Sequence, residues 1–436
     1  MSINKRDASS ATELEKFILN IDSSIAKILN IALSGKDISP DQAFELLESR
    51  GLEYQATLMV ADELRRQTVG DMVTYVVNRN INFTNVCVKR CGFCAFSRDH
   101  REEQGYFLPT EMIVEKAKQA YKYGATEVCV QAGLPPKMEG DLYVKICESI
   151  KKELPDIHVH GFSPEEVLYG SIRSKSSIES YLNNLKDAGV GSLPGTSAEI
   201  LDQEIRDKIS PGRITKDQWI EVIKTAHKLG IPTTSTIMFG HVENNMHIAN
   251  HIDTIRNIQR ETHGFTEFVP LSFVSSEAPM SVQKSIPDIR MGATGTEVMK
   301  VHAVSRIMLN NHIPNIQASW VKEGDKMSQL LLNAGVNDLG GTLINESIST
   351  SAGAMHGQLM KPSTFRDMIR STGRIPAERY TDYKIKRIYD NDDTPKEPLD
   401  LIEGSAEEIF GSYNQLANMK EHRFIHPSLK SLSGKV

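Results

Sequence analysis

Short apolar segments alternate with amphipathic segments along most of this chain. Runs rich in β-branched and aromatic residues recur between stretches whose apolar residues follow the spacing of a helix. The first such run is "TYVVNRNINF", and seven more follow at "TEVCVQAG", "DIHVHGF", "VGSLPG", "PTTSTIMFG", "FTEFVPLSFV", "NIQASW" and "VNDLGG". A helix-compatible segment follows each run, so the sequence predicts eight strand–helix units.

Strands that alternate with helices indicate right-handed crossover units and a parallel sheet. Eight such units are the number that closes a (β/α)8 barrel. We therefore predict an α/β protein with a (β/α)8 TIM-type barrel over residues 73–345, with an open doubly wound sheet as the alternative. We expect an N-terminal helical segment over residues 1–72 and a C-terminal helical region and extension over residues 346–436. From about residue 385 the sequence turns polar and contains prolines, which indicates an extension that packs outside the barrel or is partly mobile.

Charge and composition exclude several classes of function. The formal net charge of -6 gives no electrostatic basis for a nucleic-acid partner. No run approaches the roughly 18 apolar residues that span a bilayer, and the N-terminus lacks the apolar region of a signal peptide. The five cysteines are an odd number without the spacing of a disulfide framework, which is typical of a reducing compartment. We expect a cytoplasmic protein that binds neither nucleic acid nor membrane.

Three of the five cysteines lie within eight residues. Cys87, Cys91 and Cys94 form a CxxxCxxC loop directly after the first predicted strand, in "NFTNVCVKRCGFCAF". Loops after barrel strands carry the active sites of such barrels, so we expect this loop at the functional face. Thiolates bind zinc or iron–sulfur clusters. A zinc site would take His100 as its fourth ligand, whereas a cluster held by three cysteines leaves one iron open to a ligand from outside the protein.

The other two cysteines have a simpler interpretation. Cys129 lies inside a predicted strand, and Cys147 lies on the apolar stripe of a predicted helix. Free cysteines are among the most often buried residues, so we expect both to belong to the core.

The cysteine loop resembles the signature of the radical S-adenosylmethionine (SAM) superfamily. The resemblance consists of the CxxxCxxC spacing, the aromatic Phe93 beside the last cysteine, and the position after the first strand of a barrel. In that superfamily three cysteines hold a 4Fe–4S cluster, and the amino and carboxylate groups of SAM bind the open iron. The resemblance implies that Cys87, Cys91 and Cys94 ligate the cluster and that SAM is the missing fourth ligand.

Five segments resemble one family within that superfamily, the deazaflavin (FO) synthase component that joins tyrosine to a diaminouracil. They are "NRNINFTNVCVKRCGFCAF", "AHKLGIPTTSTIMFGHVE", "HGFTEFVPLSFV", "IPNIQASWVKEG" and "NDLGGTLINESIS", and the similarity extends from about residue 40 to 383. Enzymes of futalosine-dependent menaquinone synthesis share the first segment and the "GHVE" strand end. An aminofutalosine-type radical SAM enzyme is therefore one alternative, and a non-catalytic iron–sulfur or zinc protein is another.

The family resemblance implies a radical transferase. A 5'-deoxyadenosyl radical takes hydrogen from L-tyrosine, the tyrosine Cα–Cβ bond cleaves, and the hydroxybenzyl fragment joins 5-amino-6-(D-ribitylamino)uracil. The resemblance also implies a one-electron donor such as ferredoxin or flavodoxin. A companion radical SAM cyclase would then close the deazaflavin ring.

Contacts to SAM are expected in the loops after the second and fourth strands and at an arginine farther along the chain. The candidates are Gln131, Ala132, Gly133, Ser197, Glu199 and Arg213. The first three occupy the position where relatives use a Gly-rich strand end to bind the methionine amine, although a simple βα turn would look the same. Hydroxyl and carboxylate groups after the fourth strand suit the methionine or the ribose, unless the carboxylate is a charge at a helix N-terminus. The arginine either pairs with the cofactor carboxylate or lies on the surface.

Substrate contacts are expected at the ends of the third, fifth and eighth strands. His241 and Glu243 are the candidates for proton transfer or for holding the amino group of tyrosine, with a structural pair as the alternative. The candidates for substrate binding are His160, Asp338, Gly340 and Gly341. Glycines at a strand end permit a close approach of the backbone to a ligand. His160 shares a strand face with His158, and we expect at least one of them to be a buried, hydrogen-bonded histidine.

Overall fold

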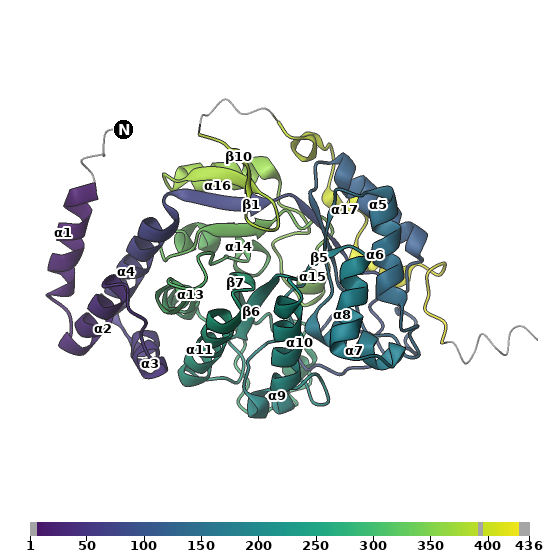
Figure 1. The fold of residues 1–436 in the computed structure, drawn as a ribbon, viewed down its shortest axis with the longest axis horizontal. Helices are drawn as coiled ribbons and strands as arrows, with labels where there is room; N and C mark the ends of the chain where they lie inside the picture. The colour runs from purple at the N-terminus through teal and green to yellow at the C-terminus, as the bar shows by residue number, and fades with distance from the viewer. Residues whose placement is uncertain (1–6, 391–395, 427–436) are drawn as a thin grey trace, which may run out of the picture.

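The computed structural model describes residues 7–390 and 396–426. Four helices come first and lie together at one side of the molecule (Figure 1): α1 (Asp7–Ile18), α2 (Ser23–Leu33), α3 (Pro40–Glu48) and α4 (Gly51–Val69). Helix α4 packs against α13 (Gly295–Leu309), and α3 packs against α11 (Asn245–Thr262). The N-terminal helices therefore cover helices of the following barrel from outside.

Strands and helices then alternate as predicted. The strands are β1 (Met72–Val76), β2 (Asn78–Ile81), β3 (Glu127–Val130), β4 (His158–His160), β5 (Val190–Ser192), β6 (Thr233–Phe239), β7 (Phe265–Ser272) and β8 (Asp338–Gly341). The other helices of this part are α5 (Thr110–Lys122), α6 (Leu142–Glu153), α7 (Pro164–Ser174), α8 (Ile178–Asp187), α9 (Gln203–Ile209), α10 (Lys216–Lys228), α12 (Pro279–Val282), α14 (Trp320–Leu331), α15 (Ile348–Ser351) and α16 (Pro362–Ser371). No described helix combines the length and the hydropathy that a bilayer crossing requires.

The parallel strands close a ring around a common interior. Strands β2, β3, β4 and β5 pair in that order, and a bridge between Leu193 and Thr233 connects β5 to β6. Strand β6 pairs with β7, bridges at Ile316 and Gln317 connect β7 to β8, and β8 pairs with β1. Because only Val77 separates β1 from β2, the ring is closed. The predicted (β/α)8 barrel is confirmed.

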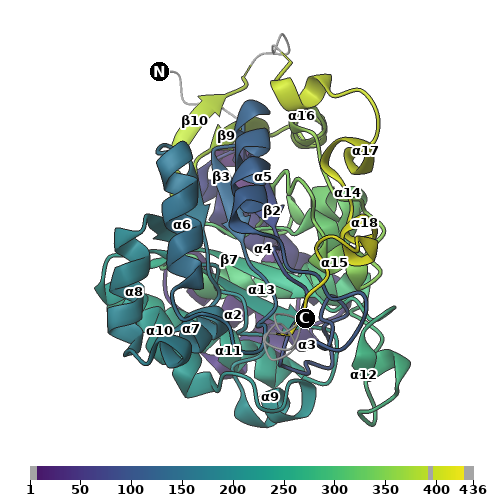
Figure 2. The ribbon, with the colours of Figure 1, turned by 90° about the vertical axis from the view of Figure 1, so that its right-hand side faces the viewer.

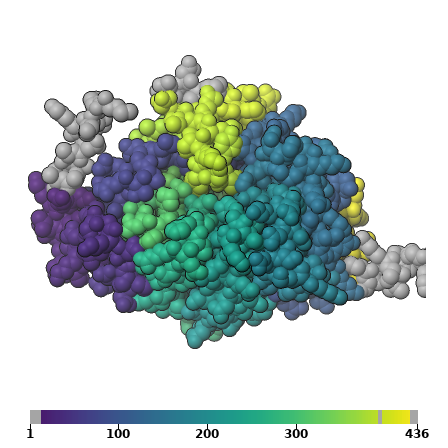
Figure 3. Space-filling model, viewed as in Figure 1, coloured from purple at the N-terminus to yellow at the C-terminus, as the bar shows by residue number. Residues whose placement is uncertain are grey.

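Two details differ from the predicted strands. The seventh predicted strand, "NIQASW", makes only isolated bridges. In addition, β9 (Ile375–Arg379) pairs in parallel with the start of β1, and β10 (Ile385–Ile388) pairs antiparallel with β9, in a segment where we expected helices. Pro376, which has no N–H to donate, obscured this short strand in the sequence. In Figure 3 the yellow-green surface of this segment lies between the purple N-terminal part and the blue part of the chain.

The C-terminal extension packs against the loop that carries the three cysteines. It contains η1 (Pro398–Leu401), α17 (Ala406–Phe410) and α18 (Tyr413–Asn418), drawn in yellow in Figure 2. The hydroxyl of Tyr413 donates to the carbonyl oxygen of Phe96 at 3.1 Å and accepts from Nδ2 of Asn85 at 3.3 Å. Farther on, the N–H of Phe424 donates to the carbonyl oxygen of Gly105 at 2.8 Å. The extension therefore holds the outer side of the cysteine loop.

Tyr413 offers a test of this contact. Tyr413→Ala removes the ring contact with Phe96 and both hydrogen bonds, so we expect a loss of about 3 kcal/mol in the free energy of unfolding and faster amide exchange over residues 85–98. Tyr413→Phe keeps the ring and should lose only about 1 kcal/mol. The matched control is Tyr121→Ala, because Tyr121 on α5 is half exposed. Unchanged amide exchange over residues 85–98 in Tyr413→Ala would show that the extension does not hold the loop.

Candidate active site

The cysteine loop is fixed by backbone hydrogen bonds along its length. The N–H of Cys87 donates to the carbonyl oxygen of Arg98 at 3.0 Å. Gly92 donates to the carbonyl oxygen of Ile209 at 2.7 Å and accepts from the N–H of Met280 at 2.7 Å. A Cβ atom at Gly92 would lie 2.9 Å from the Cβ of Met280, too close for an ordinary contact. Glycine at this position therefore lets the loop pass between α9 and α12.

A cavity of about 420 Å³ runs into the barrel, and all three cysteines line its wall. This volume is within the range of small-molecule sites. The six predicted SAM-binding residues also line this cavity, namely Gln131, Ala132, Gly133, Ser197, Glu199 and Arg213. The structure thus brings together residues that lie up to 126 positions apart, and their roles remain proposals.

Arg213 is the central charge beside the cysteines. Its guanidinium pairs with Glu199, donates to Oγ of Ser197 at 2.8 Å and lies 5.4 Å from the ring centre of Phe93. Its Nε lies 3.5 Å from Oε2 of Glu165. The side chain is 14% exposed, so the interpretation as a surface arginine is wrong. Ser197 and Glu199 have φ angles of 68° and 43°, a left-handed conformation that is concentrated at functional sites in non-glycine residues.

The loop after β3 uses its N–H groups within the protein. Ala132 donates to Oε1 of Glu166 at 2.9 Å, and Gly133 donates to the carbonyl oxygen of Thr84 at 2.8 Å. Glu166 also caps α7, because its Oε2 accepts from the N–H of Ser163 at 2.8 Å. Burial raises the pKa of Glu166 to about 7. A ligand amine at this strand end would therefore bind carbonyl oxygens, which are acceptors, and that of Gln131 already accepts from Nδ2 of Asn82 at 2.8 Å.

The three thiols fit the ligand set of an iron–sulfur cluster. Burial raises the pKa of Cys91 to about 12, an effect that nearby Arg213 opposes. Lys89 donates its N–H to Sγ of Cys87 at 3.4 Å. Cationic and N–H groups of this kind stabilise thiolates once a metal displaces their protons. His100, the fourth ligand of the zinc alternative, does not line the cavity, and its Nδ1 lies 3.4 Å from the carboxylate of the preceding residue. The residues present thus fit a cluster that takes its fourth ligand from outside the protein.

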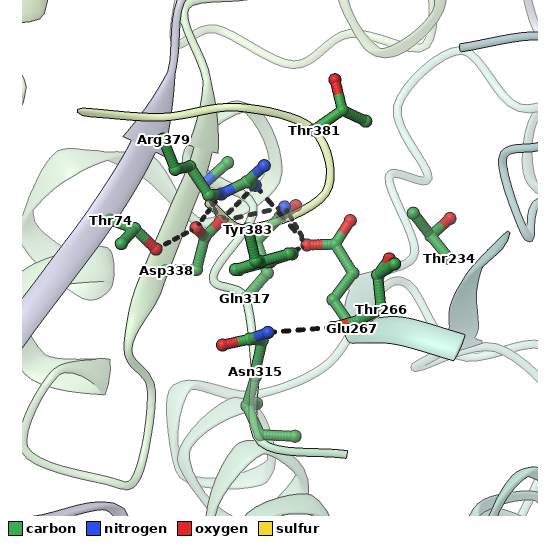
Figure 4. A network of polar contacts seen from close by, with 12 residues as sticks. Thr74, Thr234, Thr266, Glu267, Asn315, Gln317, Asp338, Arg379, Thr381 and Tyr383 are labelled. Atoms are coloured by element: carbon green, nitrogen blue, oxygen red, sulfur yellow. Dashed lines mark hydrogen bonds and ion pairs between the residues drawn. The ribbon is translucent and has the colours of Figure 1, made fainter. Parts of the chain in front are cut away.

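A network of polar side chains lies at the opposite end of the cavity, near the N-terminal ends of the strands, and Glu267, Gln317 and Arg379 of this network line the wall. Arg379 at the end of β9 donates from Nε and Nη2 to the two carboxylate oxygens of Asp338, at 2.6 and 3.0 Å. On β7, Oε2 of Glu267 accepts from Nε2 of Gln317 at 3.1 Å and from the hydroxyl of Tyr383 (Figure 4). Of these five residues, sequence reasoning singled out only Asp338. A carboxylate inside the apolar run "FTEFVPLSFV" was the one signal for Glu267.

Lys322 is a further cavity residue that sequence reasoning missed. It lines the cavity on α14, near Glu346 and Glu323. Burial lowers the pKa of Lys322, and the two carboxylates oppose this effect only in part. Its ammonium group makes no ion pair with any described carboxylate, which leaves a cation in the wall near the cysteines.

His241 and Glu243 do not line the cavity, contrary to our expectation of a catalytic role. Glu243 accepts from the N–H groups of Gly240 and His241 at 2.7 and 2.9 Å. It also pairs with Arg290, while Nε2 of His241 faces the carbonyl oxygen of Met238 at 3.0 Å. Both side chains are fully buried. Their hydrogen bonds close the loop after β6, as the structural alternative expects, and their catalytic role stays a prediction.

The predicted substrate-binding residues divide into two groups. Asp338 begins β8 instead of ending it, and its buried carboxylate binds Arg379 without forming part of the cavity wall. Gly340 and Gly341 do line the wall. His160 also lines it, and its Nδ1 lies 2.6 Å from Oγ of Ser192.

Two family descriptions match consecutive parts of the chain. "Radical SAM superfamily" matches residues 81–255, and "CofH/MqnC C-terminal region" matches residues 262–391. The first match contains the cysteines and Arg213. The second contains Glu267, Gln317 and Arg379, which belong to the polar end of the cavity.

Solved structures with similar folds include methylornithine synthase, with a TM-score of 0.61 and 18% identity, covering 80% of this chain and 97% of that one. Another is the FeFe-hydrogenase maturase HydG from Carboxydothermus hydrogenoformans, with a TM-score of 0.63 and 15% identity, covering 86% of this chain and 84% of that one. At these identities the similarity concerns the fold alone.

Much closer in sequence are proteins named "5-amino-6-(D-ribitylamino)uracil--L-tyrosine 4-hydroxyphenyl transferase". The protein of that name from Methanocaldococcus jannaschii is 50% identical over 353 residues, which is 80% of this chain and 97% of the relative. The one from Methanothermobacter thermautotrophicus is 46% identical over 367 residues, which is 84% of this chain and 99% of the relative. The chain therefore belongs to the radical SAM superfamily and, within it, to the family of these transferases.

Proposed function

We propose that this protein is a radical SAM transferase that joins the hydroxybenzyl fragment of L-tyrosine to 5-amino-6-(D-ribitylamino)uracil, a step of deazaflavin (FO) biosynthesis. The observation that carries the proposal is the CxxxCxxC loop at one end of a closed-barrel cavity in a chain 50% identical to a transferase of that name. The polar groups at the other end of the same cavity support a second, hydroxyl-rich substrate.

The cofactors bind at the cysteine end. Cys87, Cys91 and Cys94 hold the 4Fe–4S cluster, and Arg213 with Glu199 binds the methionine part of SAM. When bound, the cluster and SAM together supply a one-electron cleavage and the radical that removes hydrogen from tyrosine. The fork of Arg213 is oriented by Ser197 and Glu199, so it is positioned before a carboxylate arrives.

The barrel wall keeps the reacting groups away from water. Val269, Leu271 and Phe273 lie on the inward face of β7 and the loop after it, by the period-two alternation of a strand, and all three line the cavity. An apolar wall is suited to the aromatic ring of tyrosine. It also offers a radical few polar hydrogen donors.

The proposed function brings further expectations. The protein needs a one-electron donor such as ferredoxin or flavodoxin, and its product needs a companion radical SAM cyclase. A cytoplasmic location belongs to the same proposal, because reduced thiols and a cluster require a reducing compartment.

Replacing any one of Cys87, Cys91 and Cys94 with Ala should abolish cluster binding and the SAM-dependent formation of methionine and 5'-deoxyadenosine. The physical reason is that each thiolate holds one iron, and no other cysteine lies in the loop. Iron content, visible absorption and chromatography of the products check this under anaerobic conditions. Cys147→Ala is the matched control, since Cys147 is fully buried on α6 and should cost only stability. Full turnover in Cys91→Ala would refute the three-cysteine site.

The reaction itself is tested by mass spectrometry. Reduced protein with SAM, L-tyrosine and 5-amino-6-(D-ribitylamino)uracil should yield a tyrosine-derived hydroxybenzyl adduct. Phenylalanine should give little adduct, because the phenolic oxygen delocalises the radical of the departing fragment. A parallel reaction contains the enolpyruvyl benzoate substrate of the menaquinone route instead of the uracil. Turnover of that compound without any uracil adduct would replace the proposed function with the aminofutalosine-type alternative.

A further inference from the structure

The cavity has two chemically different ends. The cysteines and Arg213 form one end, and Glu267, Gln317, Arg379, Thr381 and Glu127 form the polar floor at the other. Since SAM binds at the cysteines, the floor is the part of the cavity farthest from the cofactor. It is therefore available to the substrate that only has to receive the transferred fragment.

Glu267 keeps one carboxylate oxygen free at the polar floor. The residue is 6% exposed. Its Oε2 accepts from Gln317 and Tyr383, and Nη2 of Arg379 lies 3.7 Å away. Its Oε1 has no hydrogen-bond partner in the described part of the chain, and Figure 4 shows this oxygen outside the network of dashed lines. This oxygen is accessible from the cavity and is not sealed inside the protein, so it is open to a hydrogen bond with a ligand.

Other polar atoms of the wall are free as well. Nε2 of His160 and Oε1 of Gln317 make no hydrogen bond with any described residue. The other polar atom of each side chain, Nδ1 of His160 and Nε2 of Gln317, is hydrogen-bonded. Together with Glu267 these residues come from three different strands or strand-like segments and line one cavity. They offer several hydrogen-bond positions to one ligand.

The chemistry of these positions suits hydroxyl groups. Burial, reinforced by Asp338 and opposed by Arg379, raises the pKa of Glu267 to about 7, so near neutral pH its carboxyl group can either donate or accept. Amide and imidazole groups also provide both kinds of position. A chain of vicinal hydroxyls, each both donor and acceptor, matches such a mixture. An aromatic ring does not match this mixture of donors and acceptors. The apolar residues farther along β7 are better suited to contact such a ring.

We propose that the polar floor, with Glu267 and Gln317 as its contacting residues, binds the ribityl chain of the acceptor uracil and thereby selects it. This inference rests on the proposed function and deepens it. Tyr383 and Arg379 act as positioning residues, because they bind the other oxygen of Glu267. The residue assignments also agree with the division of the chain, since Glu267 and Gln317 lie in the part matched by the narrower family and outside the part matched by the superfamily.

The test measures ligand selectivity by calorimetry on the anaerobic, cluster-loaded protein. The probes are 5-amino-6-(D-ribitylamino)uracil and 5-amino-6-methylaminouracil, which has the same ring without the polyol. The unmodified protein should bind the ribityl compound at least about tenfold more tightly. Glu267→Gln and Gln317→Ala should each reduce that ratio several-fold. Because Gln317 is only partly buried, Gln317→Ala decides the question if Glu267→Gln does not fold.

The matched control is Glu378→Gln. Glu378 is the neighbour of Arg379 on β9, is equally buried, and binds Lys386 and Tyr389 instead of lining the cavity. It should leave the selectivity unchanged. Equal binding of the two uracils by the unmodified protein, or full selectivity in both floor variants, would overturn the inference while the proposed function stands. Binding of neither uracil, together with no adduct by mass spectrometry, would instead refute the proposed function.

Discussion

A buried cation sets the shape of the barrel interior. The side chain of Arg379 is 4% exposed, and its partner Asp338 is fully buried. An unpaired charge in such a place would cost several kcal/mol, so the two side chains must meet. Their contact joins the end of β9 to the start of β8 and directs the following residues across the barrel, where Thr381 binds Glu127 and Tyr383 binds Glu267. The N-terminal end of the barrel is thus occupied by polar side chains that come mainly from the second family-matched region, with Glu127 from the first.

The opposite end depends on a second buried cation. Arg213 lies beside the cysteine loop and is balanced by Glu199 and Glu165. Between the two ends, the inward residues of β7 change from Glu267 to Val269 and Leu271, so the wall changes from polar to apolar along a single strand. The cavity thus has a cysteine end, an apolar middle and a polar floor, and we propose these as the places of SAM, an aromatic substrate and a polyol. This arrangement gives a physical reason why a barrel of the superfamily can bind a particular acceptor substrate through residues of its C-terminal part.

Local patterns in the sequence were enough for the barrel and for the cysteine site. The alternation of strands and helices and the position of Cys87 after the first strand are short-range features. The polar floor could not be predicted, because Glu267 and Arg379 are 112 residues apart in the chain. Only the pairing of β9 brings them close, and Pro376 makes this strand difficult to recognise in the sequence. His241 and Glu243 show the opposite difficulty, since their position at a strand end indicates function while the structure gives them contacts within the loop and with Arg290. Arg213 could not be distinguished from a surface residue without the partners that bury it.

The most direct test of this account is an anaerobic crystal structure of the cluster-loaded protein with SAM and 5-amino-6-(D-ribitylamino)uracil. The account predicts a cluster on Cys87, Cys91 and Cys94 whose fourth iron binds SAM. It also predicts the ribityl hydroxyls within hydrogen-bond distance of Glu267 and Gln317. A protein side chain on the fourth iron, or a uracil bound with its polyol toward the cysteines, would contradict it.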